Sequence, residues 1–401
     1  MRVNIDRLMG RIEQLARVGA IEGTRGNSRL ALSSADRDGR NLVRSWMQEL
    51  GLHITVDGIG NVVGCTDSDP NAGPPVMTGS HIDTVATGGR YDGVLGVLAG
   101  LEVIETLKST RLKRPLAVAF FTDEEGARFQ PDMLGSLVYV GGMPLDEALA
   151  IRDADSVSVG QELDRIRYRG SAPVPGQPPH AFVELHIEQG PVLEAEGFTI
   201  GVVEGVQGIS WTELVIEGQS NHAGTTPMNM RRDPGVVAAK IAVRARDTRL
   251  GNVATVGSIR FQPDLVNVVP AKVTMTLDLR HTDDSVLRQV EQEMLDYAHE
   301  AAHAEDVKLS ARQLARFAPV EFDAQVAQRI EDNAKGLGLS TKRMASGAGH
   351  DAQMLARVCP TAMIFVPSVD GLSHNPAEHT DQSDIEAGAN VLLATMMELA
   401  S

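Results

Sequence analysis

Histidines and carboxylates of the kind that bind metal ions follow several apolar runs of the sequence. The stretch GSHIDTVATGGRYDG (79–93) carries His81, Asp83 and Asp92 among glycines. Residues i and i+2 of an extended segment project to the same side, so we expect the Asp83 carboxylate to orient the His81 ring as a ligand. The alternative is a solvated turn with a capping histidine. A metal site needs further ligands to be preferred over that alternative.

Three more segments could supply those ligands. Glu124 and Glu125 are adjacent in TDEEGARF. Neighbouring side chains of an extended chain point to different sides, so one carboxylate could bind metal while the other handles a proton, although a solvated helix start is the alternative. His186 and Glu188 have i, i+2 spacing in ELHIEQG, which could supply a ligand and a supporting carboxylate, and His374 lies in the turn LSHNP. The combined set suits zinc or manganese and not thiolate chemistry: His81, Asp92, Glu125, His186 and His374.

The elements that must position these residues are buried strands joined by a helix. Residues 74–81 and 116–122 are short apolar runs on either side of the helical pattern of 94–107, and 182–190 and 361–368 are further apolar runs. These patterns predict strands of an α/β sheet with a crossover helix. Polar clusters follow the runs at their carboxyl ends, where open α/β sheets bind their ligands. We therefore expect the candidate ligands to meet at one edge of the sheet.

A second kind of pattern begins near Gly208. Strand patterns at 211–218 and 272–280 alternate with helical patterns at 234–248 and 285–302. This order predicts a compact α+β unit of the ferredoxin-like kind. The expected architecture is an α/β catalytic domain, with a mixed sheet flanked by helices, and an inserted α+β lid or dimerisation domain. The expected segments are 1–207 and 325–401 for the catalytic domain and 208–324 for the insertion.

Composition narrows the class of partner and the location. The 401 residues are 42% hydrophobic, enough for a sizeable core, and 53 acidic against 37 basic residues give a formal net charge of −16. Nucleic acid and anionic membranes would be repelled, so a small-molecule partner is expected. Two cysteines, Cys65 and Cys359, are too few for a disulfide framework. The N-terminus lacks the apolar core of a signal peptide, and no run approaches the ~20 apolar residues of a membrane span. These features predict a cytoplasmic protein.

Taken together, the motifs resemble one branch of the dinuclear metallopeptidase-like hydrolases, the amidase/hydantoinase/carbamoylase family. This family includes N-carbamoyl-L-amino-acid hydrolases, beta-ureidopropionases and allantoate amidohydrolases. The resemblance covers nearly the whole chain in the family's order, and it implies an aminopeptidase-like catalytic domain. It is carried by SHIDTVATGGRYDG, TDEEGARF, ELHIEQGPVLE, NHAGTTPM, RRDP, SGAGHDAQ and SHNPAE.

The resemblance implies a site with two divalent metal ions, Zn²⁺, Mn²⁺ or Co²⁺, in each subunit. Asp92 would bridge the two ions. His81 and His186 would hold one ion, and Glu125 and His374 would hold the other, with a hydroxide between them.

The resemblance also implies catalytic and substrate-binding roles. Glu124 would be the general base that takes a proton from the bridging water and passes it to the leaving nitrogen. His222, in the insertion, would stabilise the oxyanion in the partner subunit's site, which implies a homodimer. The implied substrate-binding residues are Arg280 for the carboxylate, Asn267, Gln189, His222 and the turn that ends at Gly349. From the residues alone, Arg280 could equally be a surface arginine, Asn267 a turn residue and His222 a loop histidine.

Other residues near the candidate site have supporting interpretations. Gly88 and Gly89 are expected to permit the turn that brings Asp92 back to His81, and Gly93 is expected to free the backbone beside the bridge. His350 and Asp351 in GAGHDA are expected to begin a helix or to support the ligands. They are not needed as ligands, because the five named above already complete two open metal sites.

We therefore expect a metal-dependent amidohydrolase that cleaves the linear amide of N-carbamoyl-L-amino acids or related ureido acids, releasing an amino acid, CO2 and ammonia. Allantoate amidohydrolase is the nearest alternative, followed by an acylamino-acid or peptide hydrolase of the same fold. A hypothesis from a different class is a non-catalytic, ureido-binding dimeric homologue. The segment RYDGVLGVL resembles the carbamoylases more than the allantoate enzymes. The preferred side chain and the native metal do not follow from the sequence.

Overall fold

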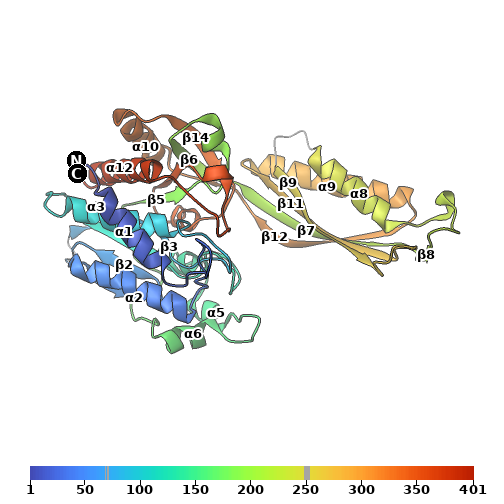
Figure 1. Ribbon diagram of the computed structural model, residues 1–401, viewed down its shortest axis with the longest axis horizontal. Coiled ribbons are helices and arrows are strands. Elements are labelled where there is room, and N and C mark those ends of the chain that lie inside the picture. Colours follow the sequence, from blue (N-terminus) through green and yellow to red (C-terminus); the bar gives the residue numbers. More distant parts are fainter. Residues whose placement is uncertain (68, 70–71, 248–252) are drawn as a thin grey trace. The chain divides into compact units, whose positions relative to one another are not determined.

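The computed structural model describes residues 1–67, 69, 72–247 and 253–401 (Figure 1). These residues form two compact units, one of Met1–Gly205 with Glu321–Ser401 and the other of Val206–Val320. We call them unit 1 and unit 2 and describe each by itself. Within the described residues, no helix is both long and apolar enough to cross a membrane.

Unit 1 is built on a mixed sheet, which has nine strands among the described residues. The strand order is β1-β2-β4-β3-β5-β15-β6-β13, and β14 pairs with β6. The centre of the sheet, β4-β3-β5-β15, is parallel, whereas β1, β2 and β6 pair in antiparallel fashion. The strands are β1 His53–Val56, β2 Val62–Cys65, β3 Val76–His81, β4 Leu116–Phe121, β5 Ala181–Ile187, β6 Ile200–Val206, β13 Val320–Glu321, β14 Thr341–Ser346 and β15 Thr361–Val366.

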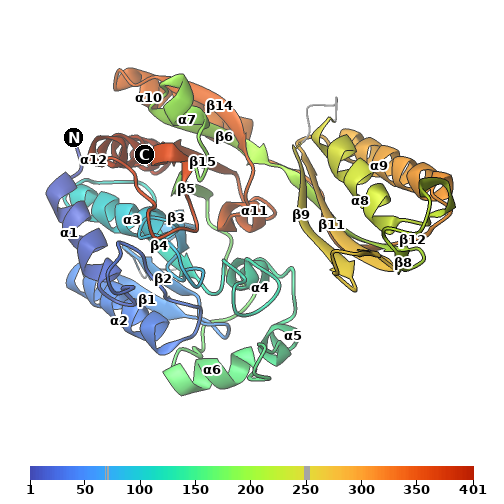
Figure 2. The ribbon, with the colours of Figure 1, turned by 45° about the vertical axis from the view of Figure 1, so that its right-hand side comes forward.

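Helices cover both faces of the central strands. Every residue of β3, β4, β5 and β15 is buried, as expected for parallel strands enclosed by helices. Helices α3 and α12 pack together on one face, and α4 and α11 pack on the other (Figure 2). The predicted α/β domain with a mixed sheet flanked by helices is confirmed. The helices are α1 Ile5–Ala16, α2 Ser34–Glu49, α3 Val94–Leu107, α4 Leu134–Tyr139, α5 Leu145–Ala150, α6 Val159–Ile166, α7 Val192–Glu196, α10 Ala324–Gly336, α11 Asp351–Leu355 and α12 Gln382–Leu399.

Among its described residues, unit 2 has a four-stranded antiparallel sheet with two α-helices, and a separate two-stranded sheet of β8 and β10. The chain runs β7, α8, β9, β11, α9, β12, and the strands lie in the order β12-β7-β11-β9, which is the predicted ferredoxin-like arrangement. Alternate strand residues such as Leu214, Ile216 and Met275 form a core with Ile241 of α8 and Met294 of α9. The elements are β7 Gly208–Glu217, β8 Asn221–His222, α8 Pro234–Arg246, β9 Val253–Gln262, β10 Val268–Val269, β11 Lys272–His281, α9 Asp284–Ala304 and β12 Lys308–Phe317. The last residue of the predicted helix 234–248 lies outside the described residues.

Candidate metal centre

The parallel strands of unit 1 bring the predicted ligands to one edge of the sheet. His81 is the last residue of β3, His186 lies near the end of β5, and Glu125 follows β4. His374 follows β15, and Asp92 precedes α3. Because β4, β3, β5 and β15 are consecutive parallel neighbours, their carboxyl ends share one edge. All five predicted ligands therefore meet there.

Asp92 lies at the centre of the cluster, with its two oxygens facing different partners. Its Oδ1 is 3.4 Å from His81 Nε2 and 3.2 Å from His186 Nε2. Its Oδ2 is 3.5 Å from His374 Nε2, which is 3.2 Å from Glu125 Oε2. The donors thus form two adjacent groups that share Asp92, and each group has the size of a metal site. This is the arrangement of a bridging carboxylate.

The surroundings of the cluster fit divalent cations. A cavity of about 100 Å³ is lined by the five ligands together with Glu124, Asp132, Gln189, Ala348, Gly349 and His350, and no Lys or Arg is among these described residues. Burial lowers the pKa of His81. Nearby carboxylates, chiefly those of Glu124 and Asp92, raise this pKa by more, so it lies well above its usual value. Hydrogen bonds that the His374 ring donates to the carboxylates of Asp92 and Glu125 raise the pKa of His374 to about 10. The site has an excess of negative charge that cations would balance.

The tautomers of the two buried histidines also fit metal binding. His81 Nδ1 is 3.0 Å from the carbonyl oxygen of Asp83, and His186 Nδ1 is 2.9 Å from the carbonyl oxygen of Ile187. A carbonyl oxygen only accepts, so each Nδ1 carries the donated proton, and Nε2 is the atom of each ring that would bind a metal ion. The backbone N–H of Gly93 donates to His186 Nε2 at 3.1 Å, in agreement with this assignment.

Two expected carboxylate partners have other roles. The nearest Asp83 carboxylate oxygen is 3.9 Å from His81 Nδ1, so the carbonyl of Asp83, and not its carboxylate, orients the ring. The Asp83 carboxylate instead accepts from the backbone N–H groups of Glu124 and Glu125, at 3.4 and 3.3 Å. Glu188 does not support His186, because its carboxylate accepts from the N–H groups that begin α7. The i, i+2 spacing correctly predicted that Asp83 orients the His81 ring, but the group that does so is the backbone carbonyl and not the carboxylate.

The side chains of Glu124 and Glu125 lie in different places, as expected for neighbours in an extended chain. Glu125 Oε2 belongs to the donor group of His374, whereas Glu124 belongs to neither group. Glu124 is 7% exposed, and its Oε2 is 3.4 Å from His81 Nε2. Burial raises the pKa of Glu124 well above its usual value, His81 opposes the increase, and neighbouring carboxylates add to it. A carboxyl with a raised pKa beside the ligands is suited to accepting and returning a proton.

Glu378 and Ser373 hold the Asp92 segment and its carboxylate in place, and the sequence did not identify them. Glu378 is 1% exposed and accepts from the backbone N–H groups of Tyr91 at 2.9 Å and Asp92 at 3.2 Å. Ser373 Oγ is 2.9 Å from Asp92 Oδ2 and 3.3 Å from Glu378 Oε2. Burial raises the pKa of Glu378 to about 7. Glu378 lies four residues after His374 in SHNPAE, and it therefore connects the segment that carries His374 to the segment that carries Asp92.

The structure gives Gly89 a reason different from the expected one, whereas Gly93 has the expected conformational role and a second, steric one. Gly88 and Gly89 are not among the described glycines with positive φ, so they do not act through a left-handed turn. A Cβ at Gly89 would overlap the Glu378 carboxylate, so this position requires close approach. Gly93 has φ +64°, and a Cβ there would meet the His81 ring at 2.5 Å. Gly93 thus serves both conformation and space.

Gln189 and Gly349 are the predicted substrate-binding residues that lie beside the ligands. Gln189 Nε2 donates to Asp92 Oδ2 at 2.8 Å, and Gly349 lines the same cavity. His350 occupies the N-cap position of α11 without a side-chain capping hydrogen bond to a described residue, its ring centroid is 4.6 Å from that of His186, and burial holds its pKa well below the usual value. Asp351 is the buried first residue of α11. His350 and Asp351 thus begin a helix and, in the case of His350, support a ligand, as expected.

The other predicted substrate-binding residues belong to unit 2 and are exposed or partly exposed. His222 in β8 pairs with Val268, and the N–H of Ala223 donates to the carbonyl of Asn267 at 2.9 Å, so His222 and Asn267 are neighbours. Arg280 pairs with Ile209 near the far end of β11, and its guanidinium contacts Asp278 at 2.8 Å. Eight residues of β11 separate Arg280 from Lys272, which corresponds to roughly 26 Å at ~3.3 Å per residue. Unit 2 therefore places His222 and Asn267 far from its own Arg280.

Comparisons with known proteins agree over the full chain. The family model described as "Peptidase family M20/M25/M40" matches residues 77–398. The chain is similar to an N-carbamoyl-L-amino-acid amidohydrolase of Rhizobium meliloti, with 41% identity over 100% of this chain and 97% of the relative. It is 37% identical to an allantoate amidohydrolase of Escherichia coli (strain K12), over 94% and 93% of the two chains. A solved amidase of the hydantoinase/carbamoylase family from Burkholderia multivorans has a TM-score of 0.96 and 42% identity, covering 100% of this chain and 98% of its own.

Proposed function

Because the chain belongs to peptidase family M20/M25/M40 and is a hydrolase of linear amides, we propose that it cleaves N-carbamoyl-L-amino acids to an amino acid, CO2 and ammonia. The resemblance of the motifs to the hydantoinase/carbamoylase amidases is confirmed. The observation that carries the proposed chemistry is Asp92, whose two oxygens face two separate groups of imidazole and carboxylate donors.

The proposed cofactors are two divalent ions, Zn²⁺, Mn²⁺ or Co²⁺, in each subunit. His81, His186 and Asp92 would hold one ion, and Asp92, Glu125 and His374 would hold the other. When bound, such ions supply an activated water and polarise the carbonyl of the substrate. Imidazole and carboxylate ligands without cysteine suit these metals and do not select one of them.

Glu124 is the proposed general base. It lies beside the donor groups without belonging to either, so its carboxylate is available to take a proton from water and deliver it to the leaving nitrogen. Asp83 supports this role by accepting from the N–H groups of Glu124 and Glu125, which fixes the backbone that separates base from ligand.

The proposed substrate contacts come from both units. Gln189 and Gly349 line the cavity beside Asp92. The guanidinium of Arg280 has the planar fork that binds a carboxylate in bidentate fashion, which the amino-acid part of the substrate provides. Asn267 would bind the substrate as well, and His222 would donate to the oxyanion that develops on the ureido carbonyl.

The spacing within unit 2 supports a homodimer. A small ureido acid is far shorter than the roughly 26 Å between the two ends of β11. One copy of unit 2 therefore cannot place His222 and Arg280 on the same substrate molecule, whereas two copies can. We propose that 208–324 is a lid or dimerisation domain and that His222 reaches the site of the partner subunit. The proposed location is the cytoplasm, as predicted from the sequence.

Allantoate is the second candidate substrate, because an allantoate amidohydrolase is also similar over most of the chain. The test is product release, before and after chelation and after Mn²⁺, Zn²⁺ or Co²⁺ is added back. Ammonia reports the turnover of N-carbamoyl-L-amino acids and allantoate, and the free amino acid reports the turnover of N-acetylamino acids and dipeptides. Release from N-carbamoyl-L-amino acids that is lost on chelation and restored by metal supports the proposal. Turnover of allantoate alone favours the second candidate, and no turnover of any compound by metal-loaded protein favours a non-catalytic binding protein.

A further inference from the structure

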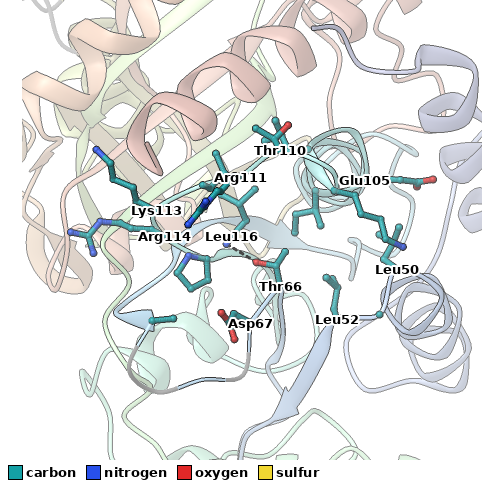
Figure 3. A pocket seen from close by; sticks show the side chains of 17 residues that line it. Leu50, Leu52, Thr66, Asp67, Glu105, Thr110, Arg111, Lys113, Arg114 and Leu116 are labelled. Carbon is teal, nitrogen blue, oxygen red and sulfur yellow. Dashed lines mark hydrogen bonds between the residues drawn. The ribbon is translucent and has the colours of Figure 1, made fainter.

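A second cavity lies at the opposite end of the central strands of unit 1 from the metal ligands. Its volume is about 420 Å³, within the range of small-molecule sites (~300–1,000 Å³). It is bordered by the carboxyl ends of α2 and α3 and by the segment 110–116, which leads into β4 (Figure 3). Because β4 begins at Leu116 and ends before Glu124, none of the predicted catalytic residues lines this cavity.

The floor of the cavity is apolar. Ile104, Leu107 and Leu116 line it and are 4%, 3% and 2% exposed. Leu50 and Leu52 add partly exposed apolar surface on one flank (Figure 3). Such a floor favours a ligand with an aromatic or aliphatic body.

The rim is strongly basic in an otherwise acidic protein. Lys108, Arg111, Lys113 and Arg114 lie within seven residues and all line the cavity, although the whole chain has a formal net charge of −16. Within the part of the chain that the structure describes, none of these four side chains forms an ion pair or a hydrogen bond. Four unneutralised cations repel one another, and a bound anion would relieve that repulsion.

Carboxylates of the lining leave this positive charge largely intact. Glu105 is already paired with Arg7 and Arg11, at 3.0 and 2.7 Å, on the flank away from Lys113 and Arg114 (Figure 3). Asp67 is exposed on the β2 side and accepts from the N–H of Asp69 at 2.9 Å. Four basic side chains of the lining therefore face a single carboxylate, that of Asp67, that forms no ion pair among the described residues.

The basic segment is held rigidly by its backbone and not by its cationic groups. The N–H groups of Lys113 and Arg114 donate to the carbonyl of Ala400 at the end of α12, at 2.8 and 3.1 Å. Thr66 and Leu116 exchange two further hydrogen bonds, of 2.9 and 3.0 Å. Since the backbone caps α12, the side chains of Lys113 and Arg114 are not required for that task, and Figure 3 shows them extended on the same flank.

We propose that this cavity is a binding site for a phosphate monoester with an apolar or aromatic body. The phosphate dianion would lie among the basic side chains, since several guanidinium and ammonium donors suit a doubly charged group better than a single carboxylate. The organic body would cover Ile104, Leu107 and Leu116. This site is independent of the proposed hydrolysis.

Isothermal titration of the full-length, metal-loaded protein with phenyl phosphate tests the proposal, with inorganic phosphate and phenol as partial ligands. The expected result is one phenyl phosphate per chain, bound at least about tenfold more tightly than phosphate, and no measurable binding of phenol. Arg111→Ala should weaken phenyl phosphate binding at least about tenfold, because it removes a charge-assisted hydrogen bond to the phosphate. Arg17→Ala removes an exposed arginine that does not line the cavity and should change nothing.

Three results would overturn the proposal. Phenyl phosphate that fails to bind at millimolar concentration excludes the site. Binding that is unchanged in both Arg111→Ala and Lys113→Ala assigns the anion elsewhere, including the metal centre. Equal affinity for phosphate and phenyl phosphate removes the apolar part of the site. The two single variants are compared only after their melting temperatures match that of the parent protein, and either one suffices for the comparison.

Discussion

The predicted metal ligands and the predicted residues of unit 2 lie in contrasting settings. His81 and His186 are buried near the ends of parallel strands, Asp92 is buried just before α3, and neighbouring groups orient all three. His222 and Asn267 are exposed in unit 2, at the opposite end of its sheet from Arg280. The first set is complete within one unit, because strand topology brings its members together. The second set can serve one substrate molecule only if another copy of the chain contributes.

The largest expected effect comes from the set at the metal centre of unit 1. Glu124→Gln keeps the shape of the side chain but removes the base, so kcat should fall by roughly 10²–10⁴. Metal content should not change, since Glu124 belongs to neither donor group. Steady-state ammonia release and elemental analysis measure the two quantities. Glu188→Gln alters another buried carboxylate, which caps α7, and should retain near-parental kcat. A near-parental kcat in Glu124→Gln would rule out this base.

A somewhat smaller loss of kcat is expected at the exposed residues of unit 2. Variants there also test whether each active site is built from two subunits. His222→Ala should lower kcat by about 10²–10³, the usual cost of removing an oxyanion donor. When His222→Ala and Glu124→Gln subunits are mixed and allowed to exchange, each hybrid dimer should contain one intact site. Random exchange should then restore about a quarter of parental activity. Mixtures that stay as inactive as the two single variants would place His222 in its own subunit's site.

A smaller loss of metal affinity and kcat is expected when Glu378, which holds the Asp92 segment in place, is replaced. Glu378→Ala removes the acceptor for the N–H groups of Tyr91 and Asp92, so metal affinity and kcat should each fall by about 10–100-fold. Glu378→Gln should recover much of this loss, because its amide oxygen can accept from the same N–H groups. Glu386→Ala, on the following helix α12, is the matched control. Equal loss of thermal stability in both alanine variants, with unchanged metal affinity, would make Glu378 merely structural.

The smallest effect is expected at the carboxylate-binding arginine. Arg280→Lys keeps the charge but loses the planar fork, so KM should rise about tenfold, which corresponds to roughly one charge-assisted hydrogen bond. The kcat should change much less, since the substrate carboxylate is remote from the scissile bond. Initial rates over a range of substrate concentrations separate the two constants. A kcat loss with an unchanged KM would assign Arg280 to the reacting atoms instead.

The sequence predicted best where local pattern and topology coincide. His81, Glu125, His186 and His374 could be placed because buried parallel strands are continuous apolar runs whose ends share an edge. Asp83 was assigned the wrong partner because a backbone carbonyl competed with the carboxylate for the same ring nitrogen. Glu378 was missed because its partners are nearly 290 residues away. Strands β9 and β12 were not located because they are edge strands with many exposed side chains.

The central claim is that Asp92 bridges two metal ions. Titrating metal-free protein with Mn²⁺ and recording electron paramagnetic resonance spectra tests it directly. A bridging Asp92 predicts two ions per chain with the spectrum of an exchange-coupled pair, and loss of that coupling in Asp92→Ala. A single bound ion, or two ions with uncoupled spectra in the parent protein, would contradict it.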